Sequence, residues 1–86
     1  SVIEGRILER PEGSYVSKLL EKGTDRIAQK VGEEAVETVI ASKNNEPQKL
    51  IEEIADLFFH LTLLLKVKGL AWKSVMTELR KRHSKS

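Results

Sequence analysis

The chain has 86 residues, of which 33% are charged, and a formal net charge of +2 at neutral pH. We expect one domain over residues 1–86, too small to bury a full core alone and therefore completed by a second copy in a homodimer. The absence of cysteines excludes disulfides and thiolate metal sites, and the small net charge argues against nucleic-acid binding.

The chain shows no targeting or membrane segment. Its longest apolar-rich run, residues 57–65, is too short to span a bilayer, and no signal peptide is evident, so we expect a soluble, cytoplasmic protein. The chain opens on Ser1 without a methionine, in sequence typical of a helix interior. This start fits a domain cut from a longer polypeptide.

The first part of the chain predicts two short helices. Residues 2–10 read as a short or truncated helix, closed by the turn-forming cluster Pro11-Glu12-Gly13. Ser14 is a suitable N-cap for a helix over residues 15–22, and Gly23 is the residue expected just past its end.

A third helix is predicted from Thr24 or Asp25, either of which can cap it, to about Ser42. Its apolar residues recur at helical spacing and form the predicted buried stripe, namely Ile27, Val31, Ala35 and Val39. Glu34 falls beside that stripe. Gly32 weakens the helix by roughly 1 kcal/mol relative to alanine.

The fourth helix, over residues 47–68, is the most apolar, and Pro47 suits its first turn. Its predicted inner stripe is Leu50, Ile54, Leu57, Phe58, Leu61 and Leu65. Further apolar residues cover its other faces, namely Phe59, Leu63, Leu64 and Val67. A helix that is apolar nearly all round is buried nearly all round, and a second copy of the chain is the simplest partner for the extra faces.

Gly69 is expected to end the fourth helix, and residues 70–83 form a last amphipathic helix. The apolar face of that helix consists of Leu70, Val75, Met76 and Leu79. The basic run at residues 80–83 suits the negative pole of a helix C-terminus. The predicted fold class is therefore all-α, a bundle of four to five helices completed by dimerisation.

Two carboxylate pairs carry the chemistry. Glu34 and Glu37 lie three residues apart on one helix, and Glu53 and Asp56 repeat that spacing on the next, so each pair shares one face. If the two helices pack antiparallel, all four carboxylates converge, with Glu33 close by. Such like charges repel strongly, and a hard divalent cation such as Mg²⁺ resolves the conflict.

The plain alternative is a solvated acidic face, since most surface carboxylates have no function. Lys30 and Glu34, for example, form an i,i+4 pair that simply stabilises a helix. Two acidic pairs at matching spacing, one of them within a very apolar helix, favour a metal site instead.

His60 and a basic set are more ambiguous. Three roles are open for His60: a metal ligand, a hydrogen-bond partner that orients a carboxylate, or a core histidine. The last two are favoured, because no second histidine lies at ligand spacing. The basic residues form either a phosphate-contacting rim beside the acids or a solvated helix face. They are Lys18, Lys22, Arg26 and Lys30.

Several runs resemble phosphoribosyl-ATP pyrophosphatase, one of the all-α nucleoside triphosphate pyrophosphatases. They are Ser14-Tyr15-Val16 with Lys18-Leu19, residues 23–37, residues 52–61 and residues 75–83. The pattern Glu-Glu-x-x-Glu…Glu-x-x-Asp marks the superfamily, whereas Arg-Ile-Ala-Gln-Lys-Val-Gly-Glu-Glu points to this member. The family usually has a longer first helix than residues 2–10 provide, which fits excision from a fusion with the cyclohydrolase of the following step.

The resemblance implies hydrolysis of phosphoribosyl-ATP to phosphoribosyl-AMP and pyrophosphate, the second step of histidine biosynthesis. The implied Mg²⁺ ligands are Glu34, Glu37, Glu53 and Asp56. Glu33 is expected to orient or deprotonate the water, although Glu34 can exchange roles with it. The residues expected to hold phosphates are Lys22, Arg26 and Lys30. Two alternatives remain, a housekeeping nucleoside triphosphate pyrophosphatase and a non-enzymatic helical interaction module.

Overall fold

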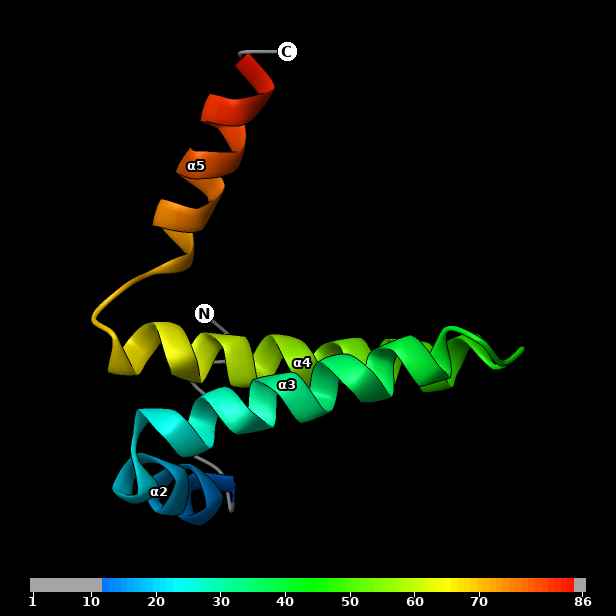
Figure 1. Ribbon diagram of the computed structural model, residues 1–86, viewed down its shortest axis with the longest axis horizontal. Coiled ribbons are helices and arrows are strands. Elements are labelled where there is room, and N and C mark those ends of the chain that lie inside the picture. Colours follow the sequence, from blue (N-terminus) through cyan, green and yellow to red (C-terminus); the bar gives the residue numbers. More distant parts are fainter. Residues whose placement is uncertain (1–11, 85–86) are drawn as a thin grey trace.

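The computed structural model describes residues 12–84, so the helix expected over residues 2–10 lies outside it. The described chain consists of four helices and contains no strand: α2 (Glu12–Lys22), α3 (Thr24–Ala41), α4 (Pro47–Val67) and α5 (Trp72–Ser84). This confirms the all-α prediction. The long helices α3 and α4 run side by side as an antiparallel hairpin, α2 packs beside the start of α3, and α5 projects away from the pair (Figure 1).

A single glycine joins α2 to α3. Gly23 has φ 88°, a left-handed conformation that glycine adopts without the penalty of a Cβ, and its amide donates to the carbonyls of Leu19 and Leu20. Its expected place after α2 is confirmed. The expected cap of α3 by Thr24 or Asp25 is wrong, because Gly23 itself occupies the N-cap position and no side chain caps the helix.

The start of α2 also differs from the prediction. Glu12 and Gly13 are helical, so they form no turn, and Ser14 lies inside the helix instead of capping it. The reason is tertiary: Val16 and Leu19 of this helix are buried in the core. Their burial outweighs the weak turn preference of one glycine near a helix end.

The core joins three helices. Val16 and Leu19 of α2 pack with Ile27 of α3 and Leu63 of α4, and Ile27 and Leu63 are almost completely buried. Partly buried side chains of α4 surround this cluster, namely Phe59, Leu64 and Val67. The core therefore lies at the end of the hairpin where α2 crosses it.

The buried face of α4 is only partly the one expected. Four residues of the predicted inner stripe are partly buried, namely Leu50, Leu57, Leu61 and Leu65. Ile54 and Phe58, assigned to the inner stripe, are 48% and 41% exposed, whereas Leu63, assigned to an outer face, is 1% exposed. Because α4 carries apolar residues on several faces, periodicity alone cannot predict which face is most buried. The packing of α2 and α3 determines that face. In α3 the stripe is likewise only partly right, because Ile27 is buried but Val39 is exposed.

Helix α5 begins at Trp72, two residues later than expected, after Gly69 ends α4 with φ 71°. Several apolar residues of α5 and of the link before it remain about half exposed, namely Leu70, Met76 and Leu79. Among residues 12–84, none of the helices combines the length and apolarity that crossing a bilayer requires.

Candidate metal and phosphate site

Three of the predicted carboxylates meet where α3 and α4 pack. Glu34 and Glu37 lie one turn apart on α3, and Glu53 lies opposite on α4. One carboxylate oxygen from each falls within 4.8 Å of the other two. The antiparallel packing assumed from the sequence is what brings these residues together, because it aligns the middle of α3 with the first half of α4.

Two lysines partly offset this negative charge. The Glu34 side chain is 9% exposed and lies 3.6 Å from Lys30 Nζ, and the Glu53 side chain is 12% exposed and lies 3.5 Å from Lys49 Nζ. A carboxylate so far removed from water needs a partner. Three clustered carboxylates with two cations leave negative charge for a divalent ion, and an all-oxygen donor set suits Mg²⁺. The residues therefore fit a bound metal.

Asp56 stands apart from this group. It lies one turn after Glu53 on α4, is exposed, and is not among the three residues that offer ligand atoms within 4.8 Å of one another. Its backbone carbonyl, however, accepts a hydrogen bond from His60 Nδ1 at 2.7 Å. Its role as a fourth ligand stays a prediction.

Glu33 belongs to an ion-pair network on the outer side of α3. Its carboxylate lies 3.4 Å from Lys30 Nζ and 3.7 Å from Arg26 Nη1, and it accepts a hydrogen bond from Gln29. Its side chain is 45% exposed, so these contacts are open to water and to incoming ligands. Lys30 thus bridges Glu33 and Glu34.

The basic residues divide by position. Arg26 and Lys30 lie on α3 beside the acids, whereas Lys18 and Lys22 are exposed on α2. Burial acts to lower the pKa of Lys30, but its interactions with Tyr15 and with the carboxylates of Glu33 and Glu34 outweigh burial and raise it above its usual value. Lys30 is therefore a permanent cation at neutral pH.

His60 lies in the core, outside the acidic group. It is 5% exposed, and both its ring nitrogens are hydrogen-bonded, Nδ1 to the Asp56 carbonyl and Nε2 to Tyr15 Oη at 2.7 Å. Among the alternatives left open, this geometry favours a satisfied core histidine.

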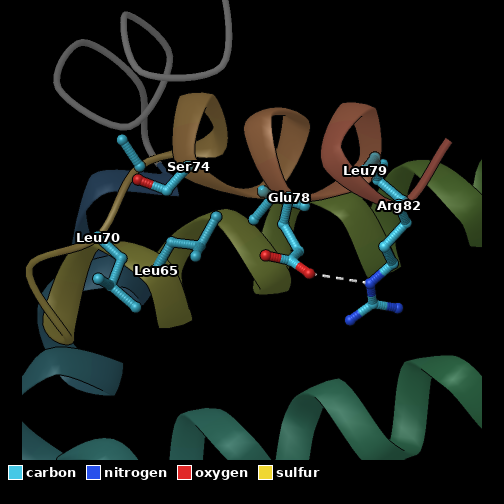
Figure 2. Close-up of a pocket in the computed structure, with 8 residues that line it drawn as sticks. Leu65, Leu70, Ser74, Glu78, Leu79 and Arg82 are labelled. Atoms are coloured by element: carbon cyan, nitrogen blue, oxygen red, sulfur yellow. Dashed lines mark hydrogen bonds and ion pairs between the residues drawn. The ribbon is translucent and has the colours of Figure 1, made fainter. Parts of the chain in front are cut away.

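A cleft of about 280 Å³ opens beside the acids, toward the α3–α4 link. It is lined by Glu37, Ile40, Ala41, Asn44, Lys49 and Glu53. A larger, mainly apolar hollow of about 380 Å³ lies elsewhere, between α5 and the end of α4 (Figure 2). None of the predicted site residues lines it, so the smaller cleft is the better place for a ligand of the acidic group.

Two residues of this region were not assigned from the sequence. Lys49 pairs with Glu53 at i,i+4 spacing, a signal that was available on the helix. Tyr15 contacts His60 across 45 residues of sequence, and no local pattern indicates such a pair.

Comparison with known proteins identifies the family. Residues 1–83 match the family described as "Phosphoribosyl-ATP pyrophosphohydrolase". The chain belongs to this family. The resemblance found in the sequence is thereby confirmed, and so is the prediction that the protein is an enzyme, a hydrolase.

The names of similar proteins agree with this family assignment. The "Phosphoribosyl-ATP pyrophosphatase" of Zymomonas mobilis subsp. mobilis is 52% identical over 86 residues, all of this chain and 80% of the relative. That of Leptospira biflexa is 51% identical over 76 residues, 88% of this chain and 83% of the relative. The "Histidine biosynthesis bifunctional protein HisIE" of Caldanaerobacter subterraneus is 46% identical over 83 residues, 96% of this chain but 40% of the relative.

Proposed function

We propose that this chain hydrolyses phosphoribosyl-ATP to phosphoribosyl-AMP and pyrophosphate in histidine biosynthesis, in the cytoplasm and with Mg²⁺ as cofactor. The relatives' names supply the substrate and the pathway. The observation that carries the chemistry is the group Glu34, Glu37 and Glu53, with ligand atoms within 4.8 Å of one another. A triphosphate brings several negative charges to this acidic surface, so hydrolysis needs cations on its oxygens.

The metal is held by Glu34 and Glu37 of α3 and by Glu53 of α4, with Asp56 as the fourth proposed ligand. When bound, Mg²⁺ neutralises and polarises the phosphate oxygens. The protein's own part is to keep the carboxylates close together. Pairing of Glu34 with Lys30 and of Glu53 with Lys49 offsets their mutual repulsion, which burial would otherwise strengthen.

Arg26 and Lys30 are the proposed phosphate contacts. Both now pair with Glu33, and phosphate oxygens compete for the same N–H donors, since charge-assisted hydrogen bonds to phosphate are strong. Lys22 is assigned to the outer edge of this basic surface. An exchange of partners from Glu33 to phosphate frees the Glu33 carboxylate.

Glu33 is the proposed residue that orients or deprotonates the attacking water. Its side chain is 45% exposed, against 9% for Glu34, so Glu33 has the better access to solvent water. A carboxylate next to a bound metal is also less free to take a proton than one outside the metal's ligand set. Exposure therefore favours Glu33 over Glu34 for this role.

We further propose that the active form is a homodimer. Apolar side chains of α5 and of the outer face of α4 are exposed, including Leu70, Met76 and Leu79, and Ile51, Ile54 and Phe58. This many large apolar side chains left exposed on two neighbouring helices supports an interaction with a second copy of the chain. Bifunctional relatives such as the one from Caldanaerobacter subterraneus support a fused or cooperating phosphoribosyl-AMP cyclohydrolase as a second partner.

The decisive experiment measures pyrophosphate release from phosphoribosyl-ATP with and without Mg²⁺, with ATP as a parallel substrate. Metal-dependent release from phosphoribosyl-ATP alone is the expected result. Release from ATP or from other triphosphates at equal efficiency would favour the housekeeping pyrophosphatase instead. If the folded protein releases pyrophosphate from none of these substrates, the acidic group is only a solvated surface and the protein is a helical interaction module.

A matched pair of variants tests the carboxylates. Glu53→Gln removes one charge from the acidic group, and Glu52→Gln removes the neighbouring exposed charge, which contacts only Gln48 among the described hydrogen bonds. We expect Glu53→Gln to lower kcat by at least about 100-fold, the order of an electrostatic group lost from a phosphoryl-transfer site. Glu52→Gln should retain wild-type turnover, and equal activity of the two variants would exclude the assignment of Glu53.

A further inference from the structure

Two lysines flank the acidic group of Glu34, Glu37 and Glu53 at opposite ends. Lys30 lies one turn before Glu34 on α3, with its Nζ 3.6 Å from that carboxylate, and Lys49 lies one turn before Glu53 on α4, with its Nζ 3.5 Å away. Because α3 and α4 run antiparallel, the turn before Glu34 and the turn before Glu53 point to opposite ends of the hairpin (Figure 1). The acidic group therefore has one cation at each end.

The protein holds these two lysines differently. The Lys30 side chain is 20% exposed and contacts two carboxylates, those of Glu33 and Glu34. The Lys49 side chain is 52% exposed, and among the described residues its ion pair is with Glu53. An ion pair open to water is weak, because solvent and salt screen it. Lys49 is therefore the cation that leaves its carboxylate more readily.

The Glu53 carboxylate needs a cation, but Lys49 need not supply it at all times. The Glu53 side chain is only 12% exposed, and one of its oxygens lies within 4.8 Å of oxygens from Glu34 and Glu37. A divalent cation held by these three carboxylates supplies the charge that Glu53 requires. The same cation repels the nearby Lys49 ammonium, because the two carry like charge. Metal binding and the Lys49–Glu53 pair therefore oppose each other.

The cleft beside the acids offers Lys49 a second place. Lys49 lines this cleft with Glu37, Ile40 and Asn44, whereas the other proposed phosphate contacts, Arg26 and Lys30, do not line it. Adjacent oxygen ligands of one Mg²⁺ ion are about 3 Å apart, since each lies about 2.1 Å from the metal in an octahedron. A phosphate oxygen on the same ion as the Glu53 carboxylate is then close enough for the flexible Lys49 side chain to contact.

We propose that Lys49 exchanges partners during substrate binding. In the free protein it neutralises Glu53, and in the substrate complex its ammonium contacts a phosphate from the end of the acidic group opposite to Lys30. This proposal rests on the proposed metal site. The competing explanation is a surface ion pair that only stabilises the start of α4. A surface pair affects stability alone, whereas an exchanging lysine opposes metal binding in the free protein and promotes substrate binding.

Lys49→Met tests both effects, because it keeps the length of the side chain and removes the charge. Mn²⁺, which prefers carboxylate oxygens as Mg²⁺ does, is titrated into substrate-free protein, and the free ion is measured by electron paramagnetic resonance. We expect its Kd to fall about fivefold, because the opposing charge is gone. At saturating Mg²⁺, KM for phosphoribosyl-ATP should rise about tenfold with kcat within about threefold of wild type, because a phosphate contact is lost.

Two further variants serve as controls. Lys49→Arg keeps the positive charge, so its Kd for Mn²⁺ and its KM should stay within about threefold of the wild-type values. Lys66→Met removes the same charge from an exposed position in the last turn of α4, away from the acids, and should leave both constants unchanged.

An unchanged Kd or an unchanged KM in Lys49→Met would overturn the exchange of partners. Changes of equal size in Lys66→Met would overturn it as well, since they would reflect net charge alone. If the wild-type protein binds no Mn²⁺ or releases no pyrophosphate, it is the proposed function that fails.

Discussion

The indole ring of Trp72 stacks on the phenyl ring of Phe58, with ring centroids 4.7 Å apart and ring planes within 4° of parallel. The Trp72 Nε1–H also donates to Thr62 Oγ1 at 2.9 Å, and that hydroxyl donates to the carbonyl of Phe58. These contacts fix the first turn of α5 to α4. They explain how α5 holds a defined direction although most of it projects from the hairpin (Figure 1).

Loss of the Trp72 hydrogen bond should weaken this anchor. We expect Trp72→Phe to lower the free energy of unfolding by about 1–3 kcal/mol, since the buried Thr62 hydroxyl loses its donor and some stacking area is lost. Urea denaturation checks the value. Thr77→Val is the control, because it removes an exposed hydroxyl bonded to a backbone carbonyl on the same helix and should change stability by less than about 0.5 kcal/mol. Equal losses for both variants would contradict the anchor.

The apolar side of α5 predicts concentration-dependent assembly. Leu79 is 53% exposed and lines the hollow between α5 and α4, where Glu78 and Arg82 form an ion pair at 3.0 Å (Figure 2). In a homodimer that covers this side, Leu79→Glu would bury an unpaired charge, and we expect it to raise the dimer dissociation constant at least about 100-fold.

Sedimentation equilibrium measures that constant. Thr77→Glu adds the same charge at an exposed α5 position outside the hollow and should leave the dimer intact. A monomeric wild type, or a dimer unaffected by Leu79→Glu, would show that a second copy does not cover this surface.

Metal binding and stability should be linked through the acidic group. Without Mg²⁺, Glu37→Gln removes one of three clustered charges, so we expect it to leave stability unchanged or to raise it by up to about 1 kcal/mol. With saturating Mg²⁺, the Tm of the wild type should rise, because the ion binds the folded site and not the unfolded chain. The Tm of the variant should rise much less, because one proposed ligand is missing. Thermal melts in Mg²⁺ and in chelator test both statements. An equal Mg²⁺ shift in the two proteins would argue against Glu37 as a ligand.

The alkaline pH dependence follows from Tyr15. Burial raises its pKa above the ordinary 10.0, and Glu34 and Glu33 add to this effect while Lys30 and Arg26 oppose it. The pKa of Tyr15 is higher in the folded protein than in the unfolded chain, so keeping the hydroxyl protonated stabilises the fold. This stabilisation is fully present below pH 10 and is lost as the pH rises through the folded pKa.

Ultraviolet titration of the phenolate reports Tyr15 directly, since it is the only tyrosine of the chain. We expect a higher midpoint in the folded protein than in urea, and a flatter loss of stability above pH 10 in Tyr15→Phe. Identical midpoints in the folded and unfolded protein would contradict the burial of this hydroxyl.

The sequence by itself determined the helices and the pairing of the acids. The sequence placed the ends of α3 and α4 within two residues, because Gly23, Pro47, Gly69 and long apolar repeats are local signals. The same i,i+3 spacing placed Glu34 beside Glu37 on one turn, and a short link between two long helices made antiparallel packing the expected arrangement.

Tertiary structure decided which faces are buried and which distant residues meet. Apolar residues lie on several sides of α4, so the contact with α2 and α3 decided that Leu63 enters the core, whereas Phe58 stacks on Trp72. The bond between Tyr15 and His60 likewise depends on how α2 crosses the hairpin. Local patterns specify helices because their hydrogen bonds are local, whereas side-chain partners across helices follow from packing geometry, which no single segment encodes.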